Sequence, residues 1–127
     1  MTDSTVTLIT GGNRSGKSRL ALEKMASYPR KIFLATAVPT DTEMEKRIER
    51  HKKERGSDFV TVEEPVHLAE MIRRHLATAD AVLVDCLTFW LNNLFHYGGN
   101  DPSKEIQDFL LLLEEKPVSL VLVTNEI

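Results

Sequence analysis

Residues 7–25 read TLITGGNRSGKSRLALEKM, and the interpretation of the whole chain starts from this stretch. The short apolar run Val6–Thr10 is typical of a buried strand, and a glycine-rich segment follows it directly. From Lys17 to Tyr28 the residues have a helical pattern, which Pro29 ends. The sequence therefore predicts a strand, a glycine-rich turn and a helix in immediate succession.

The glycine-rich turn fits the pattern G-x-x-x-x-G-K-[ST] of a phosphate-binding P-loop. Gly11 and Gly16 permit backbone torsions that other residues resist, so that successive amide N–H groups can turn toward an anion. Lys17 supplies a positive charge to the β- and γ-phosphates, and the Ser18 hydroxyl is a candidate Mg²⁺ ligand. The alternative is an ordinary glycine-rich turn, which would not require the strand before it or the helix after it. The complete loop is Gly11, Gly12, Asn13, Arg14, Ser15, Gly16, Lys17 and Ser18.

The rest of the chain alternates between apolar, strand-like runs and helical patterns. Further strands are predicted at Lys31–Thr36, Asp58–Glu64, Ala81–Asp85 and Val118–Ile127. Further helices are predicted at Thr40–Gly56, Pro65–Leu76, Leu87–Phe95 and Asp101–Leu113, with a loop at His96–Pro102. This order indicates an α/β fold like that of P-loop NTPases, with three layers: a mainly parallel sheet and helices on both of its faces. We expect residues 1–127 to form a single nucleotide-binding domain.

Composition limits the possible classes of function. The 127 residues are 42% hydrophobic and 28% charged, with a net charge of −3, which gives no electrostatic argument for binding nucleic acid or a membrane surface. No apolar run approaches the ~20 residues of a membrane span. The single cysteine, Cys86, excludes an internal disulfide, suits the cytoplasm and is expected to be a buried thiol. Because the last predicted element is a core strand, we expect a C-terminal portion of the domain to be missing.

Two residues outside the loop are candidates for chemistry. Asp85 closes the apolar strand AVLVD and is a candidate Mg²⁺ ligand; the alternative is a simple cap of the next helix. His51 shares a helical face with Met44, Ile48 and Arg55. An isolated histidine of this kind is most often a packing residue, but beside a phosphate site a neutral imidazole can attack phosphorus. His67, His75 and His96 lack such basic surroundings, and we interpret them as structural.

Several stretches together resemble one family, the bifunctional adenosylcobinamide kinase/adenosylcobinamide-phosphate guanylyltransferases of cobalamin biosynthesis. The stretches are TGGNRSGKSRLAL, FLATAVPTDTEMEKRIERHKKERG, TVEEPVHL, VLVDCLTFWLNNLF and LVLVTNEI, in the family's order over nearly the whole chain. The resemblance implies that ATP or GTP phosphorylates adenosylcobinamide. It also implies that a histidine takes GMP from GTP and passes it to adenosylcobinamide phosphate, giving adenosylcobinamide-GDP.

The resemblance also implies site residues and partners. His51 falls at the position of the nucleophile that forms the GMP–histidine intermediate, with Lys17 as the second catalytic residue. Beyond the loop, the residues matching the family's nucleotide site are Ala35, Thr36, Ala37, Lys52, Lys53, Glu54, Arg55, Glu63 and Asp85. Ser18 and Asp85 would hold Mg²⁺. The family forms trimers, and its members continue past TNE[VI] into further helices and at least one more strand.

Two other functions fit the P-loop taken alone. A kinase of a small metabolite would use the loop and Asp85 but would leave the His51 helix as a solvated surface. A non-catalytic nucleotide switch would report which phosphate state is bound, although the sequence contains no Asn-Lys-x-Asp guanine motif. Substitution of His51 separates the first alternative from the two-step enzyme, and a search for new corrinoid products separates the second.

Overall fold

A computed structural model of the chain describes residues 4–11, 16–37, 42, 45–46, 49, 53, 59–97 and 101–125. Within these residues, the strands form one five-stranded parallel sheet in the order β1-β5-β4-β2-β3. The strands are β1 (Val6–Gly11), β2 (Lys31–Ala35), β3 (Phe59–Glu63), β4 (Ala81–Asp85) and β5 (Ser119–Asn125). The predicted parallel α/β fold is confirmed.

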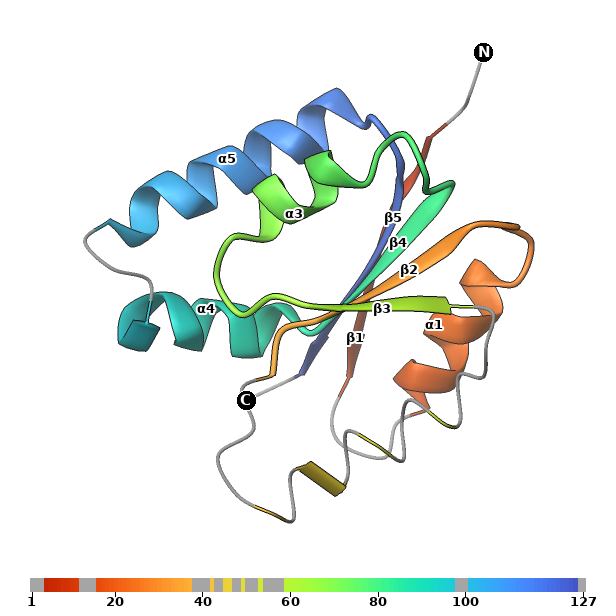
Figure 1. Cartoon of the computed structure of the whole chain (residues 1–127), viewed down its shortest axis with the longest axis horizontal. Helices are drawn as coiled ribbons and strands as arrows, with labels where there is room; N and C mark the ends of the chain where they lie inside the picture. The colour runs from red at the N-terminus through yellow and green to blue at the C-terminus, as the bar shows by residue number, and fades with distance from the viewer. Residues whose placement is uncertain are drawn as a thin grey trace.

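Helices cover both faces of the sheet (Figure 1). Helix α1 (Lys17–Met25) lies on one face. Helices α3 (Leu68–Arg74), α4 (Leu87–Tyr97) and α5 (Pro102–Glu115) lie on the other. Positions 42, 45–46, 49 and 53 are helical and fall inside the helix predicted over 40–56. Among the described helices, none combines the length and the apolar character that crossing a membrane requires.

The alternation of β5 side chains explains why the middle of the strand, residues 120–123, is apolar throughout. Leu120 and Leu122 pack into the core beneath α3, α4 and α5, whereas Val121 and Val123 pack into the core beneath α1. The strand also lies between β1 and β4, so neighbouring strands pair with both of its edges. A strand buried on two faces and two edges has no position at which water favours a polar residue.

Two predicted helices are shorter than expected, for local reasons. Helix α1 ends at Met25 rather than Tyr28, because the amides of Ala26 and Tyr28 bond to carbonyls three residues earlier and so form tighter turns. Helix α3 begins at Leu68 rather than Pro65. The Glu64 carboxylate accepts hydrogen bonds from the amides of Val66 (3.0 Å) and His67 (2.9 Å), which holds this segment as a turn.

The other boundaries move by one or two residues where they are described. Strand β1 gains Gly11, which pairs with Asn125, while β2 ends at Ala35 and β3 ends at Glu63. Helix α4 extends to Tyr97, two residues into the predicted loop. Helix α5 begins at Pro102 after its cap Asp101, as predicted, and extends to Glu115, after which Lys116 adopts a left-handed φ of 49°.

Candidate functional site

Four of the predicted site residues lie at the same edge of the sheet, where its parallel strands end. Ala35 is level with both Glu63 and Asp85 in the strand register. Gly11, at the end of β1, is level with Asn125 at the end of β5. The carboxyl edge of an open parallel sheet is where ligands bind in α/β proteins. The sheet therefore gathers these predicted positions, which are scattered along the sequence, into one region.

The turn from β1 into α1 brings a helix N-terminus to this edge. Gly16 has φ 82° and ψ 11°, the left-handed conformation, and its carbonyl accepts the first helical hydrogen bond, from the Leu20 amide at 3.1 Å. A Cβ at Gly16 would meet no atom within 4 Å, so the backbone torsion and not a lack of space favours glycine here. Lys17 and Ser18 are the first two residues of α1, and the N-terminus of a helix favours the binding of an anion.

The thiol of Cys86 shows that Lys17 and Asp85 lie near one another. Burial is the main cause that raises the pKa of Cys86 above its ordinary value. The negative charge of Asp85 raises this pKa further, whereas the positive charge of Lys17 lowers it. Both charges thus act on the same sulfur, so the predicted phosphate-binding lysine and the predicted metal ligand belong to the surroundings of one buried residue. The prediction that Cys86 is buried is confirmed.

Thr36 connects the end of β2 to the end of β4. Its side chain is fully buried, and its hydroxyl donates to the Cys86 carbonyl (2.7 Å) and accepts from the Cys86 amide (2.9 Å). Its own amide donates to the Asp85 carbonyl at 3.1 Å. Thr36 therefore fixes the backbone on both sides of the Asp85–Cys86 peptide, which is a structural role in addition to the nucleotide contact that the resemblance implies.

Sequence reasoning missed three polar residues at this edge. Asn93 of α4 is 4% exposed, and its amide nitrogen donates to the carbonyls of Thr36 (2.7 Å) and Pro65 (3.1 Å). The hydroxyls of Thr88 and Thr124 share a hydrogen bond of 2.8 Å between the start of α4 and the end of β5. The available signal was a polar side chain at a core-facing helical position, in the stretch LTFWLNNLF, which is otherwise almost entirely apolar.

The structure does not describe some of the predicted site residues. Gly12, Asn13, Arg14, Ser15, His51, Lys52, Glu54 and Arg55 lie outside the described residues. Lys53 is helical and lines a surface hollow of about 490 Å³ with Thr42, Glu45, Lys46 and Glu49. No group of three His, Cys, Asp or Glu side chains suited to a metal occurs within the described ranges. Mg²⁺ at a phosphate site does not require such a group, because it takes one or two protein oxygens and keeps phosphate and water ligands.

Two of the other histidines make contacts within the helical layer. His67 Nδ1 lies 3.2 Å from Glu105 Oε2, which connects the start of α3 to the first turns of α5. His75 Nδ1 donates to the Met71 carbonyl of its own helix at 2.8 Å. His96 lies in the last turn of α4 and is exposed. The contacts of His67 and His75 are structural, as predicted.

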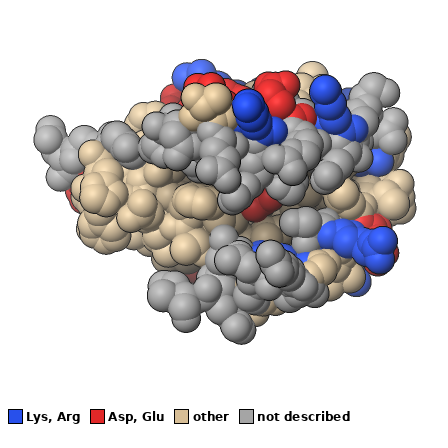
Figure 2. All heavy atoms as spheres, turned by 90° about the horizontal axis from the view of Figure 1, so that it is seen from below, with Lys and Arg blue, Asp and Glu red and all other residues tan. Residues whose placement is uncertain are grey.

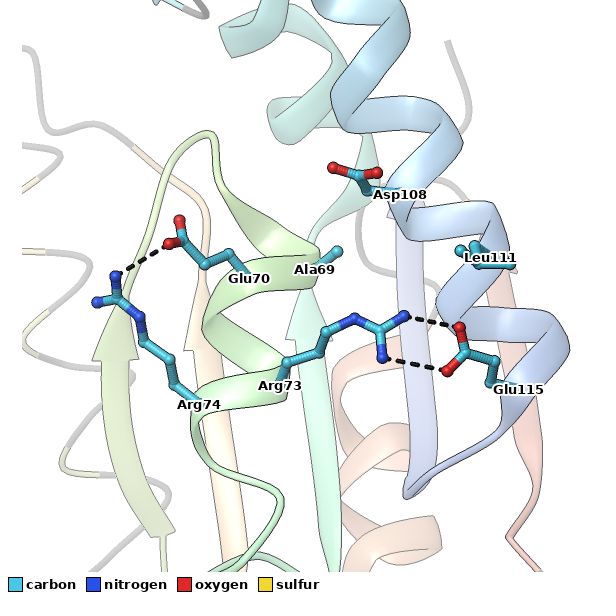
Figure 3. Close-up of a pocket in the computed structure, with 7 residues that line it drawn as sticks. All are labelled: Ala69, Glu70, Arg73, Arg74, Asp108, Leu111 and Glu115. Atoms are coloured by element: carbon cyan, nitrogen blue, oxygen red, sulfur yellow. Dashed lines mark hydrogen bonds and ion pairs between the residues drawn. The ribbon is translucent and has the colours of Figure 1, made fainter.

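A larger hollow, of about 680 Å³, lies between α3 and α5 on the outer side of the helical layer (Figure 3). Arg73 crosses it to form a two-bond ion pair with Glu115, at 3.0 and 3.2 Å, and Arg74 pairs with Glu70 at 3.0 Å. Both arginines are thus paired with carboxylates, and the described residues that line the hollow offer no unpaired positive charge to a phosphate. The site at the carboxyl edge remains the better candidate.

Figure 2 shows the molecule from below, relative to the view of Figure 1. Lys, Arg, Asp and Glu side chains lie mainly along the upper and right margins of this view, and an uncharged area occupies its left side. Helix α4 lies on that same side in Figure 1, and its exposed apolar residues include Phe89, Leu91 and Phe95.

Comparison with known proteins extends these observations. The family described as cobinamide kinase / cobinamide phosphate guanyltransferase matches residues 7–127. A bifunctional adenosylcobalamin biosynthesis protein CobP of Pseudomonas aeruginosa is 42% identical over 94% of this chain and 70% of its own length. The CobU proteins of Salmonella typhimurium and Escherichia coli are 39% and 37% identical, over 94% of this chain and 74% of their own lengths.

A solved structure supports the fold alone. A KaiC-like protein from Pyrococcus horikoshii OT3 superimposes with a TM-score of 0.61 at 20% identity. The superposition covers 96% of this chain and 61% of that one. The family model matches residues 7–127, and the relatives above are 37–42% identical to this chain. The chain therefore belongs to the cobinamide kinase / cobinamide phosphate guanyltransferase family.

Proposed function

We propose that this chain catalyses two reactions at the carboxyl edge of its sheet. It phosphorylates adenosylcobinamide with ATP or GTP, and it transfers GMP from GTP through His51 to adenosylcobinamide phosphate, giving adenosylcobinamide-GDP. The observation that carries the proposal is the match over nearly the whole chain to proteins named as bifunctional in adenosylcobalamin biosynthesis. The left-handed Gly16, the N-terminus of α1 and the charges of Lys17 and Asp85, both of which act on Cys86, support it.

In the kinase reaction, the acceptor hydroxyl attacks the γ-phosphorus and the bond to the β-phosphate oxygen breaks. The hydroxyl proton leaves, and ADP or GDP is released. Lys17 and the amides at the start of α1 stabilise the charge that develops on the phosphate oxygens. The hydroxyl of Ser18 and the carboxylate of Asp85 are oxygen donors that suit Mg²⁺, which when bound neutralises phosphate charge.

In the guanylyl reaction, an imidazole nitrogen of His51 attacks the α-phosphorus of GTP, and pyrophosphate leaves. A phosphate oxygen of adenosylcobinamide phosphate then attacks the same phosphorus and breaks the P–N bond, which regenerates the imidazole. A phosphoramidate suits this exchange because it is reactive toward oxygen nucleophiles. The further predicted nucleotide contacts of Ala35, Thr36, Ala37, Lys52, Lys53, Glu54, Arg55 and Glu63, and of loop residues Gly12, Asn13, Arg14 and Ser15, belong to this proposal.

We also propose a cytoplasmic homotrimer with a single domain over residues 1–127. The reduced, buried Cys86 supports the compartment. The trimer rests on resemblance to the family. Sedimentation of the 127-residue chain with and without GTP measures its oligomeric state; a trimer is expected, and a monomer at every concentration would contradict this part of the proposal.

The decisive test is product formation. The chain is incubated with ATP, GTP, Mg²⁺ and adenosylcobinamide. The corrinoids are then separated, and their masses are measured by mass spectrometry. Two new species are expected, the phosphate and the GDP derivative. Lys17→Ala is expected to remove both, whereas His51→Ala removes only the second. Phosphate alone from the unaltered chain would favour the simple kinase, and no corrinoid product would favour the nucleotide switch.

A further inference from the structure

We propose that Asn93 is a positioning residue that holds together the two loops from which the nucleotide site is built. This inference rests on the proposed function. Asn93 lies on α4, and its amide nitrogen donates to the Thr36 carbonyl (2.7 Å) in the segment after β2 and to the Pro65 carbonyl (3.1 Å) in the segment after β3. Both carbonyls can only accept, so a single NH₂ group supplies both bonds.

The two segments joined by Asn93 are the ones that carry predicted site residues. The first contains Thr36 and Ala37, and the chain continues from it toward the helix of His51. The second follows Glu63, and the Glu64 amide bonds back to the Ala35 carbonyl at 2.9 Å. Asn93 adds a side-chain connection one residue further along each of the two segments, at Thr36 and at Pro65. It therefore fixes the backbone that carries Thr36 and Ala37 against the backbone that follows Glu63.

The surroundings of Asn93 make these bonds costly to lose. Asn93 is 4% exposed and Thr36 is fully buried, so water does not easily replace a missing donor at the Thr36 carbonyl. Helix α1, which follows the P-loop, is held in place by other contacts. Helix α1 packs into the core on the opposite face of the sheet, with Ala21 and Met25 in contact with residues of β4 and β5. Asn93 thus acts on the segments that follow β2 and β3 and not on helix α1.

Substitution of Asn93 should therefore disturb the nucleotide site without disturbing the core of the protein. In Asn93→Ala we expect the rate of GMP transfer at saturating GTP to fall by about tenfold or more, since small displacements of reacting groups have effects of this size. The dissociation constant for GTP, measured by equilibrium titration, should rise, because Thr36, Ala37 and Glu63 are proposed nucleotide contacts. Amide hydrogen exchange should accelerate at Thr36 and Glu64, whose hydrogen bonds lie beside the lost ones.

Two control variants come from the same helix. Asn92→Ala removes the same side chain from an exposed position one residue earlier and should behave like the unaltered chain. Trp90→Phe removes a different buried bond, from the Trp90 indole to the Val66 carbonyl at 2.8 Å, and leaves Thr36 untouched. It should lower the melting temperature without lowering the transfer rate. If Asn93→Ala does not fold, Asn93→Ser, whose hydroxyl reaches at most one carbonyl, takes its place.

The outcomes separate this proposal from the proposed function. A transfer rate unchanged in the Asn93 variant, or lowered equally in Trp90→Phe, overturns the positioning role. If the unaltered chain itself transfers no GMP, the proposed function fails, and hydrogen exchange then decides the role of Asn93. Acceleration at Thr36 and Glu64 in the Asn93 variant but not in Asn92→Ala supports the connection, and unchanged exchange overturns it.

Discussion

Among the residues that the structure describes, two have backbone torsions in the left-handed region, and only one of them is a glycine. Gly16 has φ 82° before α1, and Lys116 has φ 49° after α5. A residue with a Cβ resists this region by roughly 1–2 kcal/mol. The glycine stands where the candidate phosphate site needs amides to turn inward, and the lysine stands where a helix simply ends before Pro117.

Gly16→Ala should therefore damage both folding and binding. No atom lies within 4 Å of the added Cβ, so the cost comes from the torsion, about 1–2 kcal/mol of unfolding free energy. Relaxation of the strain would turn the amides at the start of α1 and weaken GTP binding. Urea unfolding and GTP titration measure the two effects. A variant as stable as the original, with the same affinity, would show that this torsion is not needed.

At the scale of single elements, the end of α5 is a place where a residue with a Cβ can be replaced by glycine. Lys116→Gly should raise the free energy of unfolding by about 0.5–1 kcal/mol, because glycine adopts the left-handed conformation without strain but gives the unfolded chain more freedom. The Lys116 amide, which donates to the Leu112 carbonyl at 3.0 Å, is kept in the variant. Thermal melting measures the effect, and a lower melting temperature would contradict it.

The starts of β2 and β4 are joined by an ion pair that responds to pH. Asp80 accepts from the Arg30 guanidinium at 2.9 and 3.2 Å and from the Arg30 amide at 3.0 Å. The hydrogen bonds from the Arg30 side chain are the main cause that lowers the pKa of Asp80 below its ordinary value. Because the pKa is lowered, the ionised carboxylate stabilises the fold at every pH above the ordinary aspartate pKa of about 3.9. This stabilisation is lost as the pH falls through the pKa of Asp80 in the folded protein.

Asp80→Asn should therefore melt at a lower temperature than the unaltered chain at pH 7, with a difference that shrinks as the pH is lowered below about 4. Both groups are exposed, so the effect is expected to be small and to weaken in salt. Glu114→Gln, which removes an exposed carboxylate outside this ion pair, is the matched control. A difference that persists unchanged in acid would show that the Asp80 charge has no such role.

Elements and their order were predictable from local sequence, whereas contacts between distant residues were not. Apolar runs such as Ala81–Asp85 predicted strands because both faces of the sheet are covered. The pattern Gly11–Ser18 predicted the turn into α1, because its torsions are a local property of glycine. Asn93 was missed because its partners lie far away in the chain, and the late start of α3 was missed because the Glu64 side chain competes with the helix.

At the scale of the whole molecule, the order of the strands places the first strand of the chain beside the last one. Strand β5 enters between β1 and β4, which leaves β1 and β3 as the edge strands of the described sheet. Periodicity along a sequence cannot reveal such an order, because each strand looks equally apolar. The candidate site depends on it, since it places Gly11, Asp85, Ala35 and Glu63 along one edge.

Unfolding should show whether the two cores on either side of this sheet form one cooperative unit. Trp90, the only tryptophan, is 3% exposed in the core beneath α3, α4 and α5, with its ring 5.0 Å from that of Phe109. Its fluorescence reports that core, whereas circular dichroism also reports α1 in the other one. The two transitions in urea should coincide, as for a single two-state domain. Separate midpoints would divide the chain into independent units.

The central claim concerns the chemistry of His51, and capture of its nucleotidyl adduct tests it most directly. The 127-residue chain is incubated with GTP labelled at the α-phosphate, denatured, and divided between acid and alkali. A protein-bound label that survives alkali, is released by acid and is absent from His51→Ala is the predicted result, because a phosphoramidate on histidine has this stability. Label that never attaches to the unaltered chain, or that attaches equally to the variant, would contradict the claim.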